Sequence, residues 1–296
     1  KNMATLITGG TGFVGQNLEG DFSVSTKDAN LLDFEKTYKL FQDFKPDTII
    51  HAAAKHGNYA QVETDKVGYY RENALININV FEAARLSGVE NIHAFSSVTA
   101  FPDRIANFSE KDLYSGEPHH SCYPYAYAKR IIDILCRAYR EQYGLNYNCL
   151  FLANAYGPYG KDNVIPTLVN KCLYSKYKGV DFEILGDGSP LRDFIYIEDV
   201  RRILSQLSKI PNYGSLIISS GAVVSIKEVV EEIIASVGFT GSVRWKASAE
   251  IGQENKIPKN EKLISLLPNL AFTDLRTGIK KTVEWHIEAH KSQSST

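Results

Sequence analysis

The first half of the chain alternates short apolar runs with longer amphipathic stretches. Apolar runs rich in β-branched or aromatic residues predict buried strands at 4–10, 22–26, 47–54, 91–98 and 146–157. Apolar positions at helical spacing predict helices at 33–45, 69–87 and 123–143. Strands that alternate with helices over short connections indicate an α/β fold, a doubly wound parallel sheet with helices on both faces.

After Pro158 the alternation becomes less regular. The patterns there predict helices at 164–176 and 225–238, strands at 181–185 and 215–220, and a strand that runs into a helix at 193–209. We therefore predict two domains that exchange elements. Residues 1–160 with about 192–218 form the sheet domain, and residues 161–191 with 219–296 form a smaller α/β domain.

A glycine-rich loop follows the first predicted strand. In ITGGTGFVG, glycines recur at every third position before a helix begins. Glycines allow a sharp turn and a close approach of backbone amides to a pyrophosphate, which the N-terminus of the helix attracts. This context predicts a Rossmann-type dinucleotide-binding fold. The predicted cofactor contacts in the loop are Gly9, Thr11, Gly12, Phe13, Val14 and Gly15.

The end of the second predicted strand bears on which dinucleotide is bound. An NAD site usually has an acidic residue there, which holds the ribose 2′-hydroxyl. Here the strand ends in Ser25, Thr26 and Lys27, and Asp28 comes only afterwards. Two hydroxyls and a cation suit a 2′-phosphate, so the sequence predicts NADP(H). If Lys27 is only a solvated surface residue, this argument loses its force.

A serine, a tyrosine and a lysine form a candidate catalytic set. Tyr125 and Lys129 are four residues apart and so share one face of a predicted helix. Ser97 ends the preceding strand, at the edge where open α/β sheets place ligands. We expect Lys129 to lower the tyrosine pKa from about 10, so that Tyr125 exchanges a proton with the substrate. We also expect the lysine to bind the nicotinamide ribose and Ser97 to orient the substrate oxygen.

Seven segments carry a family resemblance over nearly the whole chain: TGGTGFVG, HAAAKHG, FSSVTAFP, PYAYAK, NAYGP, VIPTLV and GDGSPLRDFIYIEDV. Together they resemble the extended short-chain dehydrogenases/reductases that act on nucleotide sugars, and within that group the GDP-L-fucose synthases. The resemblance implies that the serine, tyrosine and lysine are catalytic and that Arg192 contacts the diphosphate of the substrate. Further implied contacts are Ala52, Ala53 and Ala54 for the cofactor, and Asn154 and Val164 for the substrate.

Two positions depart from the pattern of the GDP-L-fucose synthases. In that family a cysteine two residues after the catalytic serine and a histidine just before VIP epimerise carbons 3 and 5 before the ketone at carbon 4 is reduced. Here those positions are Thr99 and Asn163. Neither side chain titrates near neutral pH. We predict that both line the substrate site, and that the chain reduces a 4-keto nucleotide sugar, GDP-linked, without 3,5-epimerisation.

Other activities share parts of this pattern. A sugar-nucleotide 4-epimerase uses the same three residues but retains NAD. A bifunctional epimerase/reductase requires a replacement acid and base, for which His119 and His120 are the candidates. A 4,6-dehydratase requires an acidic pair where the chain has Val98 and Thr99, and is excluded. A non-catalytic NADP sensor has no need of the tyrosine and lysine, which are both present.

Composition narrows the choice of partners. With a net charge of −1 and scattered basic residues, the chain offers no electrostatic case for nucleic acid or an acidic membrane. We see no signal peptide and no membrane-spanning run, and expect a cytoplasmic protein. By analogy with relatives, helices 69–87 and 123–143 are expected to pair in a homodimer. The cysteines form no metal-ligand set and are expected to be reduced thiols: Cys122, Cys136, Cys149 and Cys172.

Overall fold

The computed structural model describes residues 4–247 and 255–293 of the chain. Its central sheet has six parallel strands in the order β10-β6-β4-β3-β1-β2. The order reverses at β1, because β2 pairs with one edge of β1 and β3 with the other. The predicted doubly wound parallel sheet is confirmed. Its strands are β1 (Thr5–Thr8), β2 (Phe22–Val24), β3 (Thr48–His51), β4 (Asn91–Ser97), β6 (Asn146–Leu152) and β10 (Ser215–Ile218).

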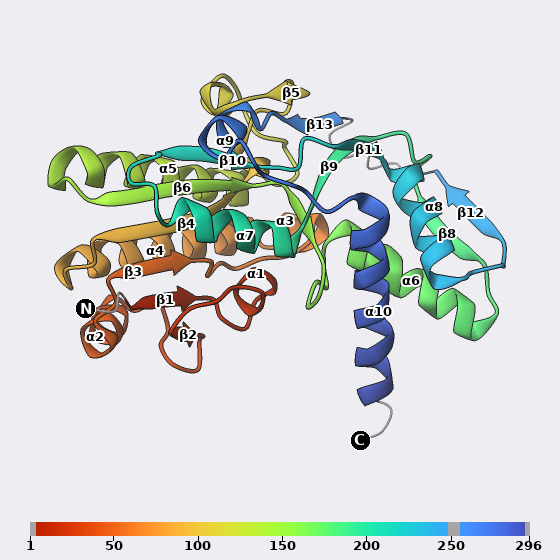
Figure 1. Cartoon of the computed structure of the whole chain (residues 1–296), viewed down its shortest axis with the longest axis horizontal. Coiled ribbons are helices and arrows are strands. Elements are labelled where there is room, and N and C mark those ends of the chain that lie inside the picture. The colour runs from red at the N-terminus through yellow and green to blue at the C-terminus, as the bar shows by residue number, and fades with distance from the viewer. Residues whose placement is uncertain (1–3, 248–254, 294–296) are drawn as a thin grey trace.

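Helices cover both faces of this sheet (Figure 1). On one face α4 packs between α2 and α5. On the other face α7 lies near α1, where Arg201 forms an ion pair with Glu19. The helices of this part are α1 (Phe13–Gln16), α2 (Phe34–Phe44), α3 (Tyr59–Thr64), α4 (Lys66–Leu86), α5 (Tyr123–Tyr143) and α7 (Ile197–Leu207).

The second half of the chain builds a separate group of elements, drawn at one end of the molecule in Figure 1. Helices α6 (Val164–Lys178), α8 (Ile226–Val237) and α10 (Leu275–Gln293) pack on one another, and β8 (Phe182–Leu185) pairs with β12 (Val243–Lys246). They enclose a hydrophobic core distinct from that of the large sheet. The second core includes Tyr156, Phe194 and Tyr196, which the sequence assigned to the sheet domain, and the division into two domains stays a prediction.

A second sheet connects the two halves. Its strand β9 (Leu191–Tyr196) pairs with β7 (Asn154–Tyr156), β11 (Val223–Ser225) and β13 (Asn255–Pro258). In turn, β13 pairs with β5 (Asn107–Phe108), and α9 (Glu261–Leu266) packs on β10. Two 3₁₀ turns, η1 (Val98–Ala100) and η2 (Glu110–Asp112), lie in the connection between β4 and α5.

Two details differ from the sequence-based predictions, and the length of α1 is new. Residues 146–157 are two strands, β6 and β7, which join different sheets. The helix after the glycine loop, α1, is a single turn. The helix predicted from residue 69 begins at Lys66 and follows a further short helix, α3. The starts of α3 and α4 are set by caps, because the side chains of Asn58 and Asp65 accept backbone N–H groups.

Among the described residues no helix is both long and apolar enough to cross a bilayer. No group of three histidine, cysteine or acidic side chains in that part of the chain is arranged to hold a metal ion. The four cysteines are buried free thiols. Free thiols are typical of reducing compartments, and the cytoplasmic location stays a prediction.

Candidate active site

The glycine loop is packed too closely to admit side chains. Gly9 has a φ of 74°, and a Cβ there would lie 2.7 Å from the backbone nitrogen of Ala53. A Cβ at Gly15 would lie 2.2 Å from the carbonyl oxygen of Gly9. Gly12 precedes α1, whose first N–H groups have no intrahelical acceptor. These features fit a pyrophosphate, and they lie where the strand order reverses between β1 and β3.

The remaining predicted cofactor residues flank this loop. Thr11, Phe13 and Val14 lie in the loop and the first turn of α1, and the segment 52–54 runs beside the loop after β3. Ser25, Thr26 and Lys27 follow β2. Asp28 does not stay apart from them as the sequence suggested, because its carboxylate accepts the backbone N–H of Ser25 at 2.7 Å. The end of β2, where the sequence predicts that the ribose of the cofactor binds, therefore holds both an exposed cation and a carboxylate.

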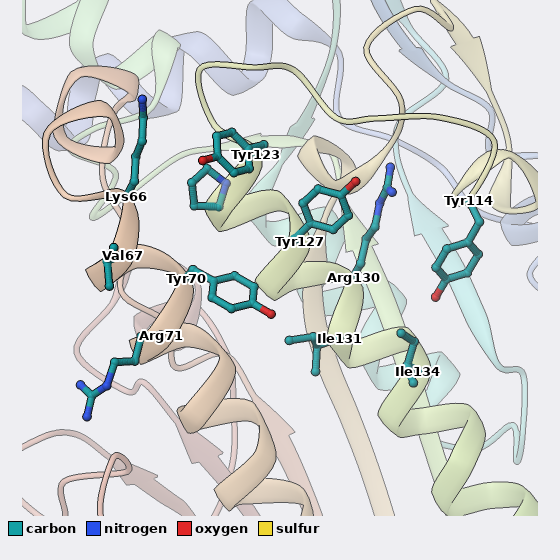
Figure 2. Close-up of a pocket in the computed structure, with 11 residues that line it drawn as sticks. Lys66, Val67, Tyr70, Arg71, Tyr114, Tyr123, Tyr127, Arg130, Ile131 and Ile134 are labelled. Atoms are coloured by element: carbon teal, nitrogen blue, oxygen red, sulfur yellow. The ribbon is translucent and has the colours of Figure 1, made fainter.

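Tyr125 and Lys129 lie on the inner face of α5. Lys129 is only 4% exposed, and its Nζ donates to the carbonyl oxygen of Phe95 at 3.0 Å. The same Nζ lies 5.7 Å from the centroid of the Tyr125 ring. Tyr123 and Tyr127 point the other way, toward an open cavity between α4 and α5 (Figure 2). The helix thus separates the candidate catalytic pair from the two neighbouring tyrosines.

Buried hydrogen bonds hold α5 against the end of the sheet. The hydroxyl of Ser96 donates to the carbonyl oxygen of Lys129 at 2.9 Å. The side-chain amide of Asn77 donates to the carbonyl oxygen of Ala128 at 3.0 Å, and its oxygen lies 3.0 Å from Nε2 of His51. The other ring nitrogen of His51 lies 2.8 Å from the hydroxyl of Thr8 on β1. This network connects the strand before the glycine loop to the helix that carries Tyr125 and Lys129.

Ser97 ends β4 beside this helix. Its hydroxyl oxygen accepts the backbone N–H of Thr99 at 3.1 Å. A serine hydroxyl has one donor and two acceptor sites, so accepting this bond leaves the O–H free to donate. Both Ser97 and Thr99 are partly exposed. A substrate oxygen can therefore reach the serine hydroxyl.

The expected effect of Lys129 on Tyr125 is not found. Burial raises the pKa of Tyr125 above its ordinary value instead of lowering it. Burial also lowers the pKa of Lys129 to about 8. The expectation was wrong because it weighed the charge of the lysine and neglected desolvation, which disfavours both charged forms. At neutral pH, Tyr125 is therefore a protonated donor beside a lysine that is still mostly charged.

The predicted substrate residues lie around β9 and the start of α6. Arg192 is on β9, and the side-chain amide of Asn154 donates to the carbonyl oxygen of Asp193 on the same strand at 2.9 Å. Asn163 precedes α6, and its amide donates to the carbonyl oxygen of Ala155 at 2.9 Å. Val164 begins α6 and is 43% exposed. The amide groups of both asparagines thus secure the backbone of this region.

The sequence did not indicate Lys256, which lies on β13 and pairs in register with Arg192 on the neighbouring strand β9. Lys256 is 8% exposed, and its pKa falls to about 8, mainly through burial and further through the charge of Arg192. Two neighbouring cations of this kind suit a diphosphate. No local pattern indicated Lys256, because its position beside Arg192 comes from the pairing of strands 64 positions apart in the chain.

The two loop histidines also lie in this region. The rings of His119 and His120 have centroids 4.4 Å apart, and Nδ1 of His119 lies 2.7 Å from the hydroxyl of Ser121. Burial lowers the pKa of His119, and the nearby charge of Lys256 lowers it further. A second histidine that sequence reasoning did not single out, His56, packs edge-on against the ring of Tyr125.

A glycine loop at the reversal of a parallel sheet, with a serine, tyrosine and lysine beside it, defines a dinucleotide-binding protein of the oxidoreductase type. Residues 5–214 match the NAD dependent epimerase/dehydratase family. The chain belongs to this family, which confirms the resemblance to enzymes of nucleotide sugars.

Individual relatives agree over nearly the full length. The chain is 34% identical to a probable GDP-L-fucose synthase of Drosophila melanogaster, over 96% of this chain and 97% of that protein. It is also 34% identical to the GDP-L-fucose synthase of Dictyostelium discoideum, over 97% and 96%. A crystal structure of a GDP-L-fucose synthetase from Naegleria fowleri bound to NADP matches with a TM-score of 0.90 and 30% identity, covering 98% of this chain and 94% of that chain.

Proposed function

We propose that the protein is an NADPH-dependent reductase of a 4-keto nucleotide sugar, GDP-linked, and that it does not epimerise carbons 3 and 5. The enzyme class and the cofactor predicted from the sequence, an NADP-dependent oxidoreductase of nucleotide sugars, are supported by the named relatives and by the NADP in the Naegleria structure. The 4-keto substrate and the absence of epimerisation are our inference from the residues of the site.

The observations that support the proposal are that Ser97 ends β4 at the same edge of the sheet as the glycine loop after β1, and that Nζ of Lys129 lies 5.7 Å from the centroid of the Tyr125 ring. NADPH, when bound, supplies the hydride that carbon 4 receives. Ser97 donates a hydrogen bond to the ketone oxygen, because its O–H remains free. Tyr125 donates its proton to the same oxygen as negative charge develops there. The raised pKa of Tyr125 keeps it protonated before the reaction, as a proton donor must be.

Lys129 serves both the cofactor and the tyrosine. One of its three N–H groups is bound to the carbonyl oxygen of Phe95, which fixes the position of Nζ. The other two N–H groups are available for the nicotinamide ribose. The positive charge also stabilises the tyrosinate that remains after proton transfer. The lysine therefore acts at the end of the step, when Tyr125 has lost its proton.

The residues at the two epimerase positions support loss of that activity. Thr99 and Asn163 carry an alcohol and an amide, which do not exchange protons with carbon near neutral pH. The amide of Asn163 is moreover engaged with the backbone of β7. At the other end of the substrate, Arg192 and Lys256 form the pair of cations that we assign to the diphosphate.

The test is NADPH oxidation with a panel of GDP-4-keto sugars in deuterated water, with products analysed by NMR. We expect oxidation without deuterium at carbon 3 or 5. Tyr125→Phe is expected to lower turnover by about 100-fold or more, the usual contribution of a general acid. Tyr127→Phe, two residues away on the outer face of α5, is the matched control and keeps its activity. Deuterium at either carbon contradicts the loss of epimerisation, and an active Tyr125→Phe variant refutes the assigned proton donor.

The carboxylate of Asp28 supports a second candidate, an NAD-dependent 4-epimerase. It reaches the end of β2, where an acidic residue would hold the ribose 2′-hydroxyl of NAD. An epimerase retains its dinucleotide through the cycle. Protein that purifies with bound NAD and interconverts 4-epimers without net NADPH oxidation favours this candidate.

The homodimer predicted by analogy has support from the outer faces of α4 and α5. A cavity of about 660 Å³ opens between them, and Figure 2 shows tyrosines and aliphatic side chains around it. Val67 is 75% exposed, Tyr70 47% and Ile134 46%, which is unusual for such side chains on one face. We propose that a second copy covers this face. Ile134→Glu is expected to give monomers by sedimentation, whereas Tyr177→Glu on α6 leaves dimers. A monomeric parent protein refutes the idea.

A further inference from the structure

His56 lies close to the candidate proton donor. It follows β3 at the carboxyl end of the large sheet, and its ring is perpendicular to that of Tyr125, with centroids 6.1 Å apart at 84°. The side chain is exposed to solvent, yet protein atoms surround the ring closely enough that desolvation lowers its pKa. A substrate that receives a proton from Tyr125 can therefore also reach the ring of His56.

The backbone that carries His56 is held firmly in place. The side-chain oxygen of Asn73 accepts the backbone N–H of Lys55 at 2.9 Å, and its amide donates to the carbonyl oxygen of Lys55 at 3.0 Å. Nζ of Lys55 forms ion pairs with Asp65 and Glu72 at 2.7 Å and 2.8 Å. These contacts fix the residue immediately before His56, so the backbone from which the ring projects is set before any ligand arrives.

The residue after His56 is held just as closely. A Cβ at Gly57 would lie 2.0 Å from the hydroxyl oxygen of Tyr69 on α4, so any other residue at this position would have to displace that tyrosine side chain.

The ring nitrogens of His56 are available to a ligand. Within residues 4–247 and 255–293, neither of them forms a hydrogen bond with the protein. Burial and the charge of Lys129 lower the pKa of His56, against an opposing effect of Asp162, so the ring is neutral at pH 7. A neutral imidazole has one donor and one acceptor, the same pair that a sugar hydroxyl offers in return.

We propose that His56 binds the sugar ring of the substrate through a hydroxyl next to the reacting carbon, and thereby selects sugars that carry this hydroxyl. The inference rests on the proposed function, because Tyr125 must reach the ketone oxygen to within about 3 Å. A sugar in that position places its neighbouring hydroxyls beside the ring of His56. The alternative role is packing alone, in which the edge of the ring only orients Tyr125.

Two substitutions separate these roles. His56→Phe keeps an aromatic edge against Tyr125 and removes both polar nitrogens. His56→Gln removes the aromatic ring and keeps a donor and an acceptor. His290→Phe, an exposed position on α10, is the matched control. The probes are GDP, GDP-L-fucose and GDP-D-mannose, titrated by calorimetry into the NADP⁺-loaded protein. GDP contacts everything except the sugar site, so its affinity reports on the rest of the pocket.

We expect His56→Phe to weaken at least one GDP-sugar about 3- to 10-fold, the effect of one lost hydrogen bond, and to leave GDP unchanged. His56→Gln should recover part of the loss, and His290→Phe should match the parent. Unchanged GDP-sugar affinity in His56→Phe overturns the proposal and leaves the proposed function standing. Equal losses for GDP and the GDP-sugars indicate a packing role and also overturn it. If the parent protein binds none of the probes, both proposals fail in their GDP-linked form.

Discussion

Replacing Lys256 by methionine should make the protein more stable at neutral pH. Lys256 is 8% exposed on β13, and the fall of its pKa from 10.5 to about 8 means that the folded state disfavours its charge. A shift of this size corresponds to about 3 kcal/mol of unfolding free energy. Methionine has a similar volume and no charge. Lys256→Met should therefore raise the free energy of unfolding by up to about 3 kcal/mol at pH 7.

The pH dependence identifies charge as the cause. The folded pKa lies below the unfolded one, so between pH 8 and 10.5 the unfolded chain binds the additional proton and stability rises with pH. Below pH 8 the full penalty is present. The advantage of Lys256→Met should therefore shrink to about 1 kcal/mol at pH 10. The comparison with the parent at each pH cancels the titration of all other groups.

The assay is urea unfolding of the parent and of Lys256→Met at pH 7 and pH 10, with Lys259→Met as control. Lys259 is exposed and lies three residues further along the chain, so its replacement should change stability little at either pH. Thermal unfolding should show the same order, with about 2–4 °C for each kcal/mol. The reasoning is refuted if Lys256→Met has no higher free energy of unfolding than the parent at pH 7, or if the increase is the same at both pH values. The stabilised variant should bind GDP more weakly, because it lacks one of the two cations assigned to the diphosphate.

Three further predictions concern the frame of the site. Gly9→Ala should weaken NADPH binding and lower the melting temperature far more than Gly88→Ala. A Cβ at Gly9 would lie 2.7 Å from the backbone, whereas one at Gly88 would meet nothing within 4 Å. Similar losses of stability and of NADPH affinity in the two variants would contradict this. Asn73→Ala should lower the free energy of unfolding by about 1–3 kcal/mol, because it leaves the backbone N–H and carbonyl of Lys55 without their hydrogen bonds, and it should raise KM for the sugar. An unchanged unfolding midpoint would disprove the predicted loss of stability. Ser225→Ala removes a capping box and should cost about 1 kcal/mol while kcat stays unchanged; a changed kcat would oppose it.

The elements at the carboxyl edge of the large sheet could be predicted from the sequence. The glycine loop, the strands around it and the helix of Tyr125 and Lys129 are each encoded in one continuous segment. Apolar runs, glycine spacing and the four-residue interval on a helix are local signals, and local signals survive without knowledge of the fold. The sequence did not predict that residues 146–157 divide into two strands, because a bend between two strands has no strong local signal.

The substrate end depended on contacts between distant segments. Lys256 lies beside Arg192 only because β13 pairs with β9, and His56 lies beside Tyr125 only because the loop after β3 meets α5. The pKa of Tyr125 shows the same limit, since its direction is decided by burial and not by the neighbouring lysine.

The sequence by itself determined the class of the fold and the family, and it supplied the residues that we propose carry the chemistry. Only the tertiary structure decided which groups surround those residues, how far each is removed from water, and therefore which protonation states they hold. The physical reason is that backbone periodicity and turn chemistry act between neighbours in the chain, whereas desolvation and charge pairing act between neighbours in space.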